Sequence, residues 1–360
     1  MGRGHPFIVK SFHVRQSSFL NHLKHCQINS CLHDHANGNS VKIRVEEVIK
    51  SSIGEFQERL SIFKCLQKDW AQFGTPSFKG VHVLNGTIID VPATDIILEP
   101  TSPIFAHVKK DTFTDTCGMA AHVNGRKAME KAYFEYVERQ SLIHMWLTKS
   151  EGEHIKPDLT NPSISRKYRL LTELLEKIYF VNISIRPDIY VIMTIGFDQQ
   201  VFSVGLAAHR DINKAIESSI DEFIMIGESL ISFKVETTGQ PMASGNIFVD
   251  YFYNMERDEF YQEIKFLLES SSPMNKIEER TEEWNLRRSM KAYCEELDVD
   301  LYLVDIPMPI DTNSCKVVKL YSPDGYPHMH TELFDPSEYK ISRSLKATFF
   351  PNQNRMIPFA

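Results

Sequence analysis

The sequence predicts a mixed fold of helices and strands, of the α/β or α+β class. Two patterns support this prediction: short runs rich in β-branched residues are broken by glycine and proline, as in strands, and longer stretches repeat apolar residues every three or four positions, as in helices. The chain has 360 residues, of which 42% are hydrophobic and 24% are charged. Such a composition is typical of globular proteins, and the length suffices for one large domain or two lobes.

The expected elements alternate along the chain. The first helix is expected over residues 41–67, where Ile49, Ile53 and Phe56 follow the helical period. Further helices are expected at 125–149, 164–178, 211–232, 257–271 and 277–297. Strands are expected in short runs within 80–109 and at 179–186, 189–197, 199–207, 300–308 and 315–322.

Two regions are expected. Residues 1–40 are rich in histidine and asparagine and are predicted to be irregular, whereas residues 41–360 are predicted to form one domain with a proline-containing C-terminal tail. Because disordered tails are usually polar, this apolar tail is expected to pack. In the first region, Cys26 and Cys31 with flanking histidines could hold zinc, but no second pair of ligands is evident. A histidine-rich loop is therefore the favoured interpretation.

Charge, hydropathy and cysteine content argue against several classes of protein. The formal net charge is −7 and no long Lys/Arg block occurs, which disfavours nucleic acid as a partner. No apolar run reaches the length of a membrane span, and the N-terminus has neither an uninterrupted apolar core nor a signal-peptide cleavage site. The 6 cysteines are too few for a disulfide scaffold at this length, so reduced thiols in the cytoplasm are expected.

The most informative feature is an internal repeat. The segment "CGMAAHVNGRKAMEKAYFEYVERQS" resembles "VGLAAHRDINKAIESSIDEFIMIGE", and Gly118 aligns with Gly205 at an offset of 87 (205 − 118). A weaker third copy, "EEVIKSSIGEFQERL", aligns Glu55 with Glu135 at an offset of 80 (135 − 55). Three helices thus carry an acid at a comparable position, and two of them add a second acid three residues on, followed by an arginine.

This pattern predicts a metal–phosphate site. Residues i and i+3 share one helical face, and the acids of the first helix border its apolar stripe, where carboxylates are costly unless they are paired or bound to metal. If the helices pack together, their carboxylates can converge on one cleft and hold Mg²⁺ with its phosphates, while the arginines face phosphate oxygens. The alternative is a solvated helix face with local salt bridges, which three copies in register make less attractive.

These segments resemble the YcaO family. "KSSIGEFQERL" is similar to the family's Gly-Glu-x-x-Glu-Arg helix, the segment beginning at Cys117 to its Asn-Gly-x-Ala…Glu-x-x-Glu-Arg motif, and the segment beginning at Val204 to its Gly-x-Gly…Asp…Ala…Glu motif. "SPD" with "HM" at 322–329 and the closing "MIPF" resemble the YcaO subunit of microcin-type azole synthetases. The resemblance runs from about residue 41 to the C-terminus and implies a fold whose carboxylate-rich helices bind ATP around a cleft. No Walker motif G-x-x-x-x-G-K-[ST] is present, in agreement with that family.

The resemblance also implies roles for individual residues. The expected magnesium ligands are Glu55, Glu58, Glu135 and Glu138, and the last two are also expected to be catalytic. The expected nucleotide contacts add Ser51, Arg59, Arg139, Glu222 and Lys319. The family's C-terminus is thought to enter the active site, which makes the carboxylate of Ala360 a candidate general base.

By the same resemblance, the expected activity is an ATP- and Mg²⁺-dependent cyclodehydration of Cys, Ser or Thr in a precursor peptide. No leader-binding module is visible ahead of the family region, so a ThiF-like partner subunit is expected, and a flavin-dependent dehydrogenase would be another chain. Two alternatives stay open: a YcaO enzyme that forms thioamides or amidines, and a scaffold without catalysis. The second arises because Met225 stands where the family usually has Gln, and a thioether lacks the donors of an amide.

Overall fold

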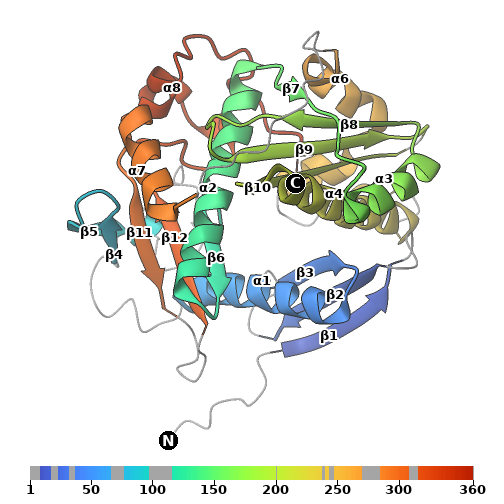
Figure 1. Cartoon of the computed structure of the whole chain (residues 1–360), viewed down its shortest axis with the longest axis horizontal. Helices are drawn as coiled ribbons and strands as arrows, with labels where there is room; N and C mark the ends of the chain where they lie inside the picture. The colour runs from blue at the N-terminus through green and yellow to red at the C-terminus, as the bar shows by residue number, and fades with distance from the viewer. Residues whose placement is uncertain are drawn as a thin grey trace, which may run out of the picture. The chain divides into compact units, whose positions relative to one another are not determined.

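The computed structural model describes residues 9–17, 23–31, 37–65, 77–96, 116–199, 201–236, 240–242, 247–269, 284–307 and 315–359. The chain packs into two compact units. Unit 1 comprises Met1–Tyr136 and Val299–His328, and unit 2 comprises Val137–Asp298 and Met329–Ala360. Helix α2 (Gly125–Thr148) begins in unit 1 and ends in unit 2. Mixed helices and sheets confirm the predicted fold class (Figure 1).

Unit 1 begins with an antiparallel sheet of order β1-β2-β3, covered by helix α1 (Figure 1). These elements are β1 (Val9–Gln16), β2 (Lys24–Ser30), β3 (Asn37–Lys42) and α1 (Val45–Cys65). The expectation that residues 1–40 are irregular is therefore wrong for the described part of that segment. The strands escaped prediction because polar residues surround Cys26 and Ile28, which pack against Phe56 of α1.

The second sheet of unit 1 has the order β5-β4-β11-β12-β6, and all its neighbouring pairs are antiparallel. Its strands are β4 (Ser77–His82), β5 (Ile88–Pro92), β6 (Met119–His122), β11 (Tyr302–Ile306) and β12 (Lys316–Tyr321), and a short 3₁₀ helix, η1 (Ala93–Asp95), follows β5. Met119, Val304 and Val317 are fully buried in the core of this sheet.

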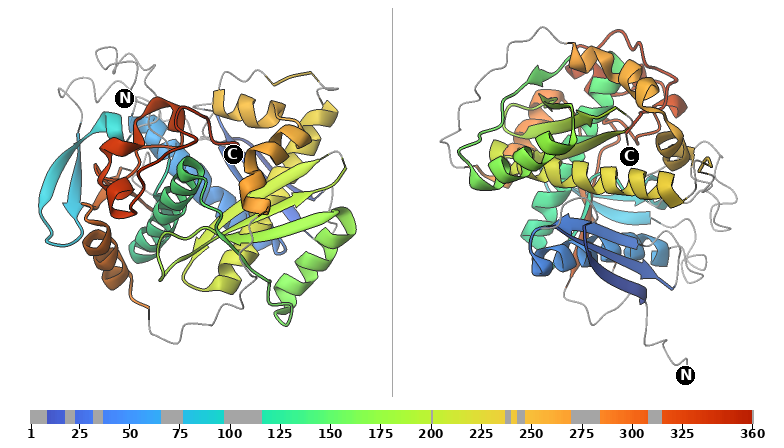
Figure 2. Two further views of the ribbon diagram at one scale, coloured as in Figure 1. Left: turned by 90° about the horizontal axis from the view of Figure 1, so that it is seen from above. Right: turned by 90° about the vertical axis from the view of Figure 1, so that its right-hand side faces the viewer.

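Unit 2 is built on an antiparallel sheet of order β10-β9-β8-β7, along which α4 lies (Figure 2). Its strands are β7 (Glu153–His154), β8 (Lys177–Asn182), β9 (Tyr190–Phe197) and β10 (Phe202–His209). Its helices are α3 (Pro162–Leu174), α4 (Ile212–Glu236), α5 (Ile247–Asn254), α6 (Arg257–Leu268), α7 (Leu286–Leu297) and α8 (Lys340–Ser344), with 3₁₀ helices η3 (Thr331–Leu333) and η4 (Pro336–Glu338). Every residue of β9 is buried, so its apolar run is a central strand.

Most predicted elements are confirmed within a few residues, and three differences are informative. Strand β6 was not predicted because its sequence, "MAAH", has no β-branched residue. Helix α5 was not predicted because aromatic residues dominate it. The predicted helix at 277–297 is confirmed from Leu286 onward, while 277–283, like the end of the 80–109 run, lie outside the described residues. Among the helices that the structure describes, none has the length and hydropathy needed to cross a bilayer.

The predicted repeat is a structural repeat of three strand–helix pairs, β3–α1, β6–α2 and β10–α4. In each pair the helix begins three residues after the strand ends: Lys42 to Val45, His122 to Gly125, and His209 to Ile212. A glycine occupies the matching position near each strand. A Cβ at Gly38 would overlap the backbone oxygen of Ser52, and a Cβ at Gly205 that of Ser219. Gly38 and Gly205 therefore let α1 and α4 approach their strands closely.

The junctions of the second and third pairs repeat even their hydrogen bonds. The backbone N–H of Asn124 donates to His122 Nδ1 (2.8 Å), and that of Asp211 donates to His209 Nδ1 (2.9 Å). Burial and the nearby cation of Lys214 lower the pKa of His209 to about 4, so its ring is neutral and able to accept near pH 7. The side chains of Asn124 and Asp211 in turn cap α2 and α4.

Candidate functional site

Helix α1 presents two acids and an arginine within one turn. The carboxylate of Glu55 accepts a hydrogen bond from the backbone N–H of Asn39 (2.6 Å) and forms an ion pair with the guanidinium of Arg59 (2.6 Å). Arg59 also donates to the side-chain oxygen of Asn37. Strand β3 thus orders the first acid and the arginine, as expected of groups that are held in place for a ligand.

Glu58 is the most perturbed carboxyl of this turn. Desolvation and the charge of Glu55 raise the pKa of Glu58 to about 8, against the opposing effects of Arg59, Lys131 and a backbone hydrogen bond from Ala121. A carboxyl group whose ionisation is disfavoured by burial and by a neighbouring carboxylate is suited to a hard cation, which would relieve that penalty. The donor set of α1 therefore fits Mg²⁺. Lys131, on α2, is a charged neighbour of Glu58 that the sequence alone did not indicate.

Helix α2 repeats the pattern of α1. Glu135 is half-buried, Glu138 is 8% exposed, and Arg139 Nε lies 3.6 Å from Glu138 Oε1. Because α2 is continuous, the two acids share one face at i and i+3, as predicted. On α2 the arginine pairs with the second acid, Glu138, whereas on α1 the arginine pairs with the first acid, Glu55.

Glu222 of α4 occupies the position that corresponds to Glu55. Its carboxylate accepts a hydrogen bond from the backbone N–H of Leu206 (3.3 Å), and Leu206 matches Asn39 in the repeat. Arg139, Glu222 and Phe359 line one small cavity of about 10 Å³, the size of a single water site. Within unit 2, the structure therefore brings together two predicted site residues and the end of the C-terminal tail.

The C-terminal tail is held by the end of α2 and by α6. Trp146 Nε1 donates to the carbonyl oxygen of Arg355 (3.2 Å), and the Arg355 guanidinium lies over the Trp146 ring while pairing with Glu263 (2.5 Å). Phe359 is 3% exposed and contacts Trp146 and Phe260 edge-on. The expectation that the apolar tail packs is confirmed for the described residues.

The other predicted site residues differ in their surroundings. Ser51 is exposed on α1, whereas the adjacent Ser52 is buried and donates to the carbonyl oxygen of Cys26 (3.0 Å). Lys319 is 5% exposed and lies on β12 between Val304 and Met119. Ala360 lies outside the described residues.

In the part of the chain that the structure describes, no three His, Cys, Asp or Glu side chains are grouped closely enough to hold a metal ion. The described residues around Cys26 and Cys31 contain no such group either, and neither cysteine is in a disulfide, while His22, His33 and His35 lie outside the described residues. The metal-ligand predictions for Glu55, Glu58, Glu135 and Glu138 stay predictions.

Comparisons with known proteins identify the family. Residues 68–324, more than half of the chain, match the model of the YcaO cyclodehydratases, which are described as binding ATP and Mg²⁺. No curated protein sequence gives a significant match. The prediction of ATP and Mg²⁺ as cofactors is thereby confirmed at the level of the family.

Solved structures support the same fold. The chain is similar to a chain of the E. coli microcin synthetase McbBCD complex with pro-MccB17 bound, at 17% identity over 97% of this chain and 96% of that one, with a TM-score of 0.71. YcaO from Methanopyrus kandleri, bound with AMPPCP and Mg²⁺, matches at 12% identity over 89% and 86%, with a TM-score of 0.67. A heterocyclase in complex with substrate and cofactor matches at 13% identity over 98% and 54%, with a TM-score of 0.73. The family match and the shared fold together show that this chain belongs to the YcaO family.

Proposed function

We propose that this protein is an ATP- and Mg²⁺-dependent peptide cyclodehydratase that forms azoline rings from Cys, Ser or Thr in a ribosomally made precursor peptide. The observation that carries the proposal is the acid–acid–arginine turn of α1, in which the pKa of Glu58 is raised to about 8 and Glu55 is tied to β3 and Arg59. Such a turn is suited to a cation that arrives with phosphate, and the family is one that binds both ATP and Mg²⁺.

The reaction requires activation of a poor leaving group. A side chain of the peptide loses its proton and attacks the preceding backbone carbonyl carbon, which closes the ring. The former carbonyl oxygen receives the γ-phosphoryl group of ATP, and phosphate then leaves as the amide nitrogen loses its proton and the C=N bond forms. The peptide loses the elements of one water, and ATP becomes ADP and phosphate. In this scheme the cation would be held by Glu55, Glu58, Glu135 and Glu138. Arg59 and Arg139 would face phosphate oxygens, and the nucleotide contacts would be completed by Glu222, Ser51 and Lys319.

We further propose that the protein works in a multi-subunit synthetase in the cytoplasm. The similar E. coli chain belongs to a complex described with pro-MccB17, which favours a peptide substrate and partner subunits here too. A ThiF-like subunit would grip the peptide's leader, and a flavin-dependent dehydrogenase would oxidise the azolines. None of the 5 cysteines whose side chains the structure describes is in a disulfide, in keeping with a reducing compartment.

The test is mass spectrometry of a candidate precursor peptide incubated with ATP, Mg²⁺, this protein and its partner subunits. Each ring closed should lower the peptide mass by about 18 Da, the mass of one water. Glu135→Gln should abolish both this loss and ATP turnover, whereas Glu130→Gln, on the same helix but outside the predicted site, should leave them intact.

The experiment also separates the alternatives once the modified residues are located by fragmentation. A thioamide-forming enzyme would raise the peptide mass by the exchange of oxygen for sulfur. An amidine formed between two parts of the peptide also loses one water, but its fragment spectrum shows a cross-link and no modified Cys, Ser or Thr. A scaffold subunit would give no ATP turnover with any partner or peptide. The presence of Met225 in place of Gln is the sequence feature that keeps the scaffold alternative in view.

A further inference from the structure

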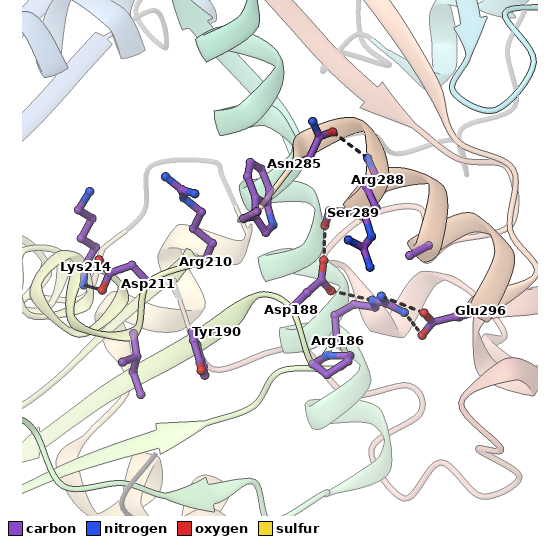
Figure 3. Close-up of a pocket in the computed structure, with 14 residues that line it drawn as sticks. Arg186, Asp188, Tyr190, Arg210, Asp211, Lys214, Asn285, Arg288, Ser289 and Glu296 are labelled. Carbon is purple, nitrogen blue, oxygen red and sulfur yellow. Dashed lines mark hydrogen bonds and ion pairs between the residues drawn. The ribbon is translucent and has the colours of Figure 1, made fainter. Parts of the chain in front are cut away.

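Unit 2 contains a second cavity that shares no residue with the small cavity beside Glu222. It has a volume of about 500 Å³, within the range of small-molecule sites, and lies between the β10–α4 junction and α7 (Figure 3). Four of its lining residues are basic: Arg186, Arg210, Lys214 and Arg288. This cavity is called the basic pocket below.

The acids of the basic pocket are already engaged. Arg186, which is 4% exposed, pairs with Glu296 and with Asp188 (3.2 Å), and Asp188 also accepts a hydrogen bond from Ser289 (Figure 3). Asp211 accepts from backbone N–H groups in the first turn of α4. The buried arginine is therefore neutralised by two carboxylates, and the third carboxylate is committed to capping a helix.

The remaining three cations differ from Arg186 in their surroundings. Among the described residues, no ion pair joins the side chain of Arg210, Lys214 or Arg288 to a carboxylate. Arg210 lies over the ring of Trp284, 5.3 Å from its centroid. The charges of Lys214 and Arg210 also contribute to the low pKa of His209, after the larger effect of burial, so this histidine adds no positive charge near pH 7. Among the described lining residues, the basic pocket thus holds four cations against three carboxylates, and three of the cations make no ion pair.

The cations stand on two walls of the basic pocket. Arg210 and Lys214 come from the β10–α4 junction and extend in the same direction, whereas Arg288 comes from the first turns of α7 on the other side (Figure 3). Helix α7 begins with an uncharged cap, because the side chain of Asn285 accepts from the backbone N–H of Arg288 (3.1 Å), and its first turn has no acid. The positive end of the α7 dipole thus adds to the field of the three side chains.

We propose that the basic pocket binds a polyphosphate anion, either inorganic pyrophosphate or the diphosphate group of a nucleotide, at a site separate from the acidic helices. A single carboxylate is satisfied by one arginine fork, whereas three cations on two walls match an anion with several charges spread along its length. Phosphate oxygens are also the acceptors best suited to arginine and to helix N-termini. The proposal does not depend on the peptide chemistry proposed above.

The test is titration of the full chain with pyrophosphate and, separately, with ADP, in buffer containing EDTA so that a magnesium-dependent site stays silent. Calorimetry measures binding, and Trp284, one of 3 tryptophans, serves as a fluorescence reporter. Binding should be saturable, and Arg288→Gln or Arg210→Gln should each raise Kd about tenfold. The matched control is Arg287→Gln, which removes the same charge from an exposed neighbour outside the pocket and should change Kd less than twofold by the same reasoning.

The two ligands distinguish the sources of the anion. Tighter binding of ADP than of pyrophosphate identifies a nucleotide site, and equal or weaker binding identifies an inorganic one. The proposal is overturned by the absence of saturable binding of both, by equal losses in Arg287→Gln and Arg288→Gln, or by tighter binding of a dicarboxylate such as succinate. It is also overturned if Glu58→Gln abolishes the binding, since that would place it at the acidic helices.

Discussion

Two strand–helix pairs, β3–α1 and β10–α4, have the same backbone plan and different chemistry. In both, a glutamate in the middle of the helix accepts a hydrogen bond from the matching backbone N–H of the strand: Glu55 from Asn39, and Glu222 from Leu206. Three residues later the pairs diverge, because α1 continues with Glu58 and Arg59 where α4 has Met225 and Ile226.

This difference suggests a division of labour within the repeat. The first glutamate of α1 and of α4 ties its helix to its strand, while we propose that the second acid, present on α1 and α2 and replaced by Met225 on α4, supplies the charge that a cation needs. A second contrast lies on α4 itself, whose Asp221 is paired with the buried ammonium of Lys167 (2.5 Å) from α3. Helix α4 thus devotes an acid to packing, whereas the second acid of α1 is the one that we propose for ligand chemistry.

The largest expected effect concerns the buried ion pair between Lys167 and Asp221 of α4. Lys167→Met should lower the free energy of unfolding by about 3–5 kcal/mol, because it leaves the buried carboxylate of Asp221 without its cation. Urea denaturation measures the change. Lys291→Met is the control, since its pair with Glu295 is exposed and should be worth less than about 1 kcal/mol. Equal losses in both variants would show that burial of the ion pair is not what matters.

The next largest effect concerns the proposed role of Glu58 in ATP turnover. Glu58→Gln should lower ATP turnover about 100-fold or more, because an amide cannot neutralise a cation that clamps phosphate. Met225→Leu, a change of similar volume at the matching position of α4, should leave turnover nearly unchanged. Turnover is measured with partner subunits and peptide present. A comparable loss in the Met225 variant would erase the distinction between the two helices.

A smaller effect should appear in the pH dependence of stability. The pKa of Glu58 is raised from 4.5 to about 8, so between these values the folded state binds more protons than the unfolded state. The contribution of Glu58 to stability is therefore present at low pH and is lost as pH rises through about 8. Denaturation midpoints at several pH values should fall across this window in the wild type and fall less in Glu58→Gln. A parallel pair of curves would contradict the shift.

The smallest effect concerns the shared hydrogen bond. Glu222→Gln should cost about 1 kcal/mol, because a charge-assisted bond to the backbone of Leu206 becomes a neutral one. Glu55→Gln should cost less than Glu222→Gln, since it also removes the repulsion between Glu55 and Glu58. Chemical denaturation of the two single variants measures the difference. A larger cost for the Glu55 variant would mean that its pair with Arg59 outweighs this relief.

Sequence periodicity was sufficient to predict the long elements and the repeat. The alignment of Gly118 with Gly205 predicted a shared helix position for the glutamates, and the strand–helix junctions match at that same offset. The resemblance of the repeated motif to the YcaO family was confirmed by the family model.

Other features depend on tertiary contacts that produce no periodic pattern in the sequence. The sheet of β1, β2 and β3 is rich in polar residues, several of which are buried, so its composition suggested a loop. The charge of Lys131 on α2 lowers the pKa of Glu58 on α1, and no local sequence pattern links these two helices at that point. The basic pocket draws on three separate stretches of chain, and no local pattern links Arg210 to Arg288.

The close approach at Gly38 and Gly205 has a consequence for mutational tolerance. Because a side chain at either position would collide with the backbone of its own helix, a saturation scan should find that almost nothing but glycine survives there. The profile of tolerated residues along β3–α1 can be superimposed on that along β10–α4 with a shift of 167 positions (205 − 38). The two profiles should coincide at the glycine and differ at Glu58 and Met225. Such a plot would distinguish what the architecture demands from what the ligand demands, without a ligand being present.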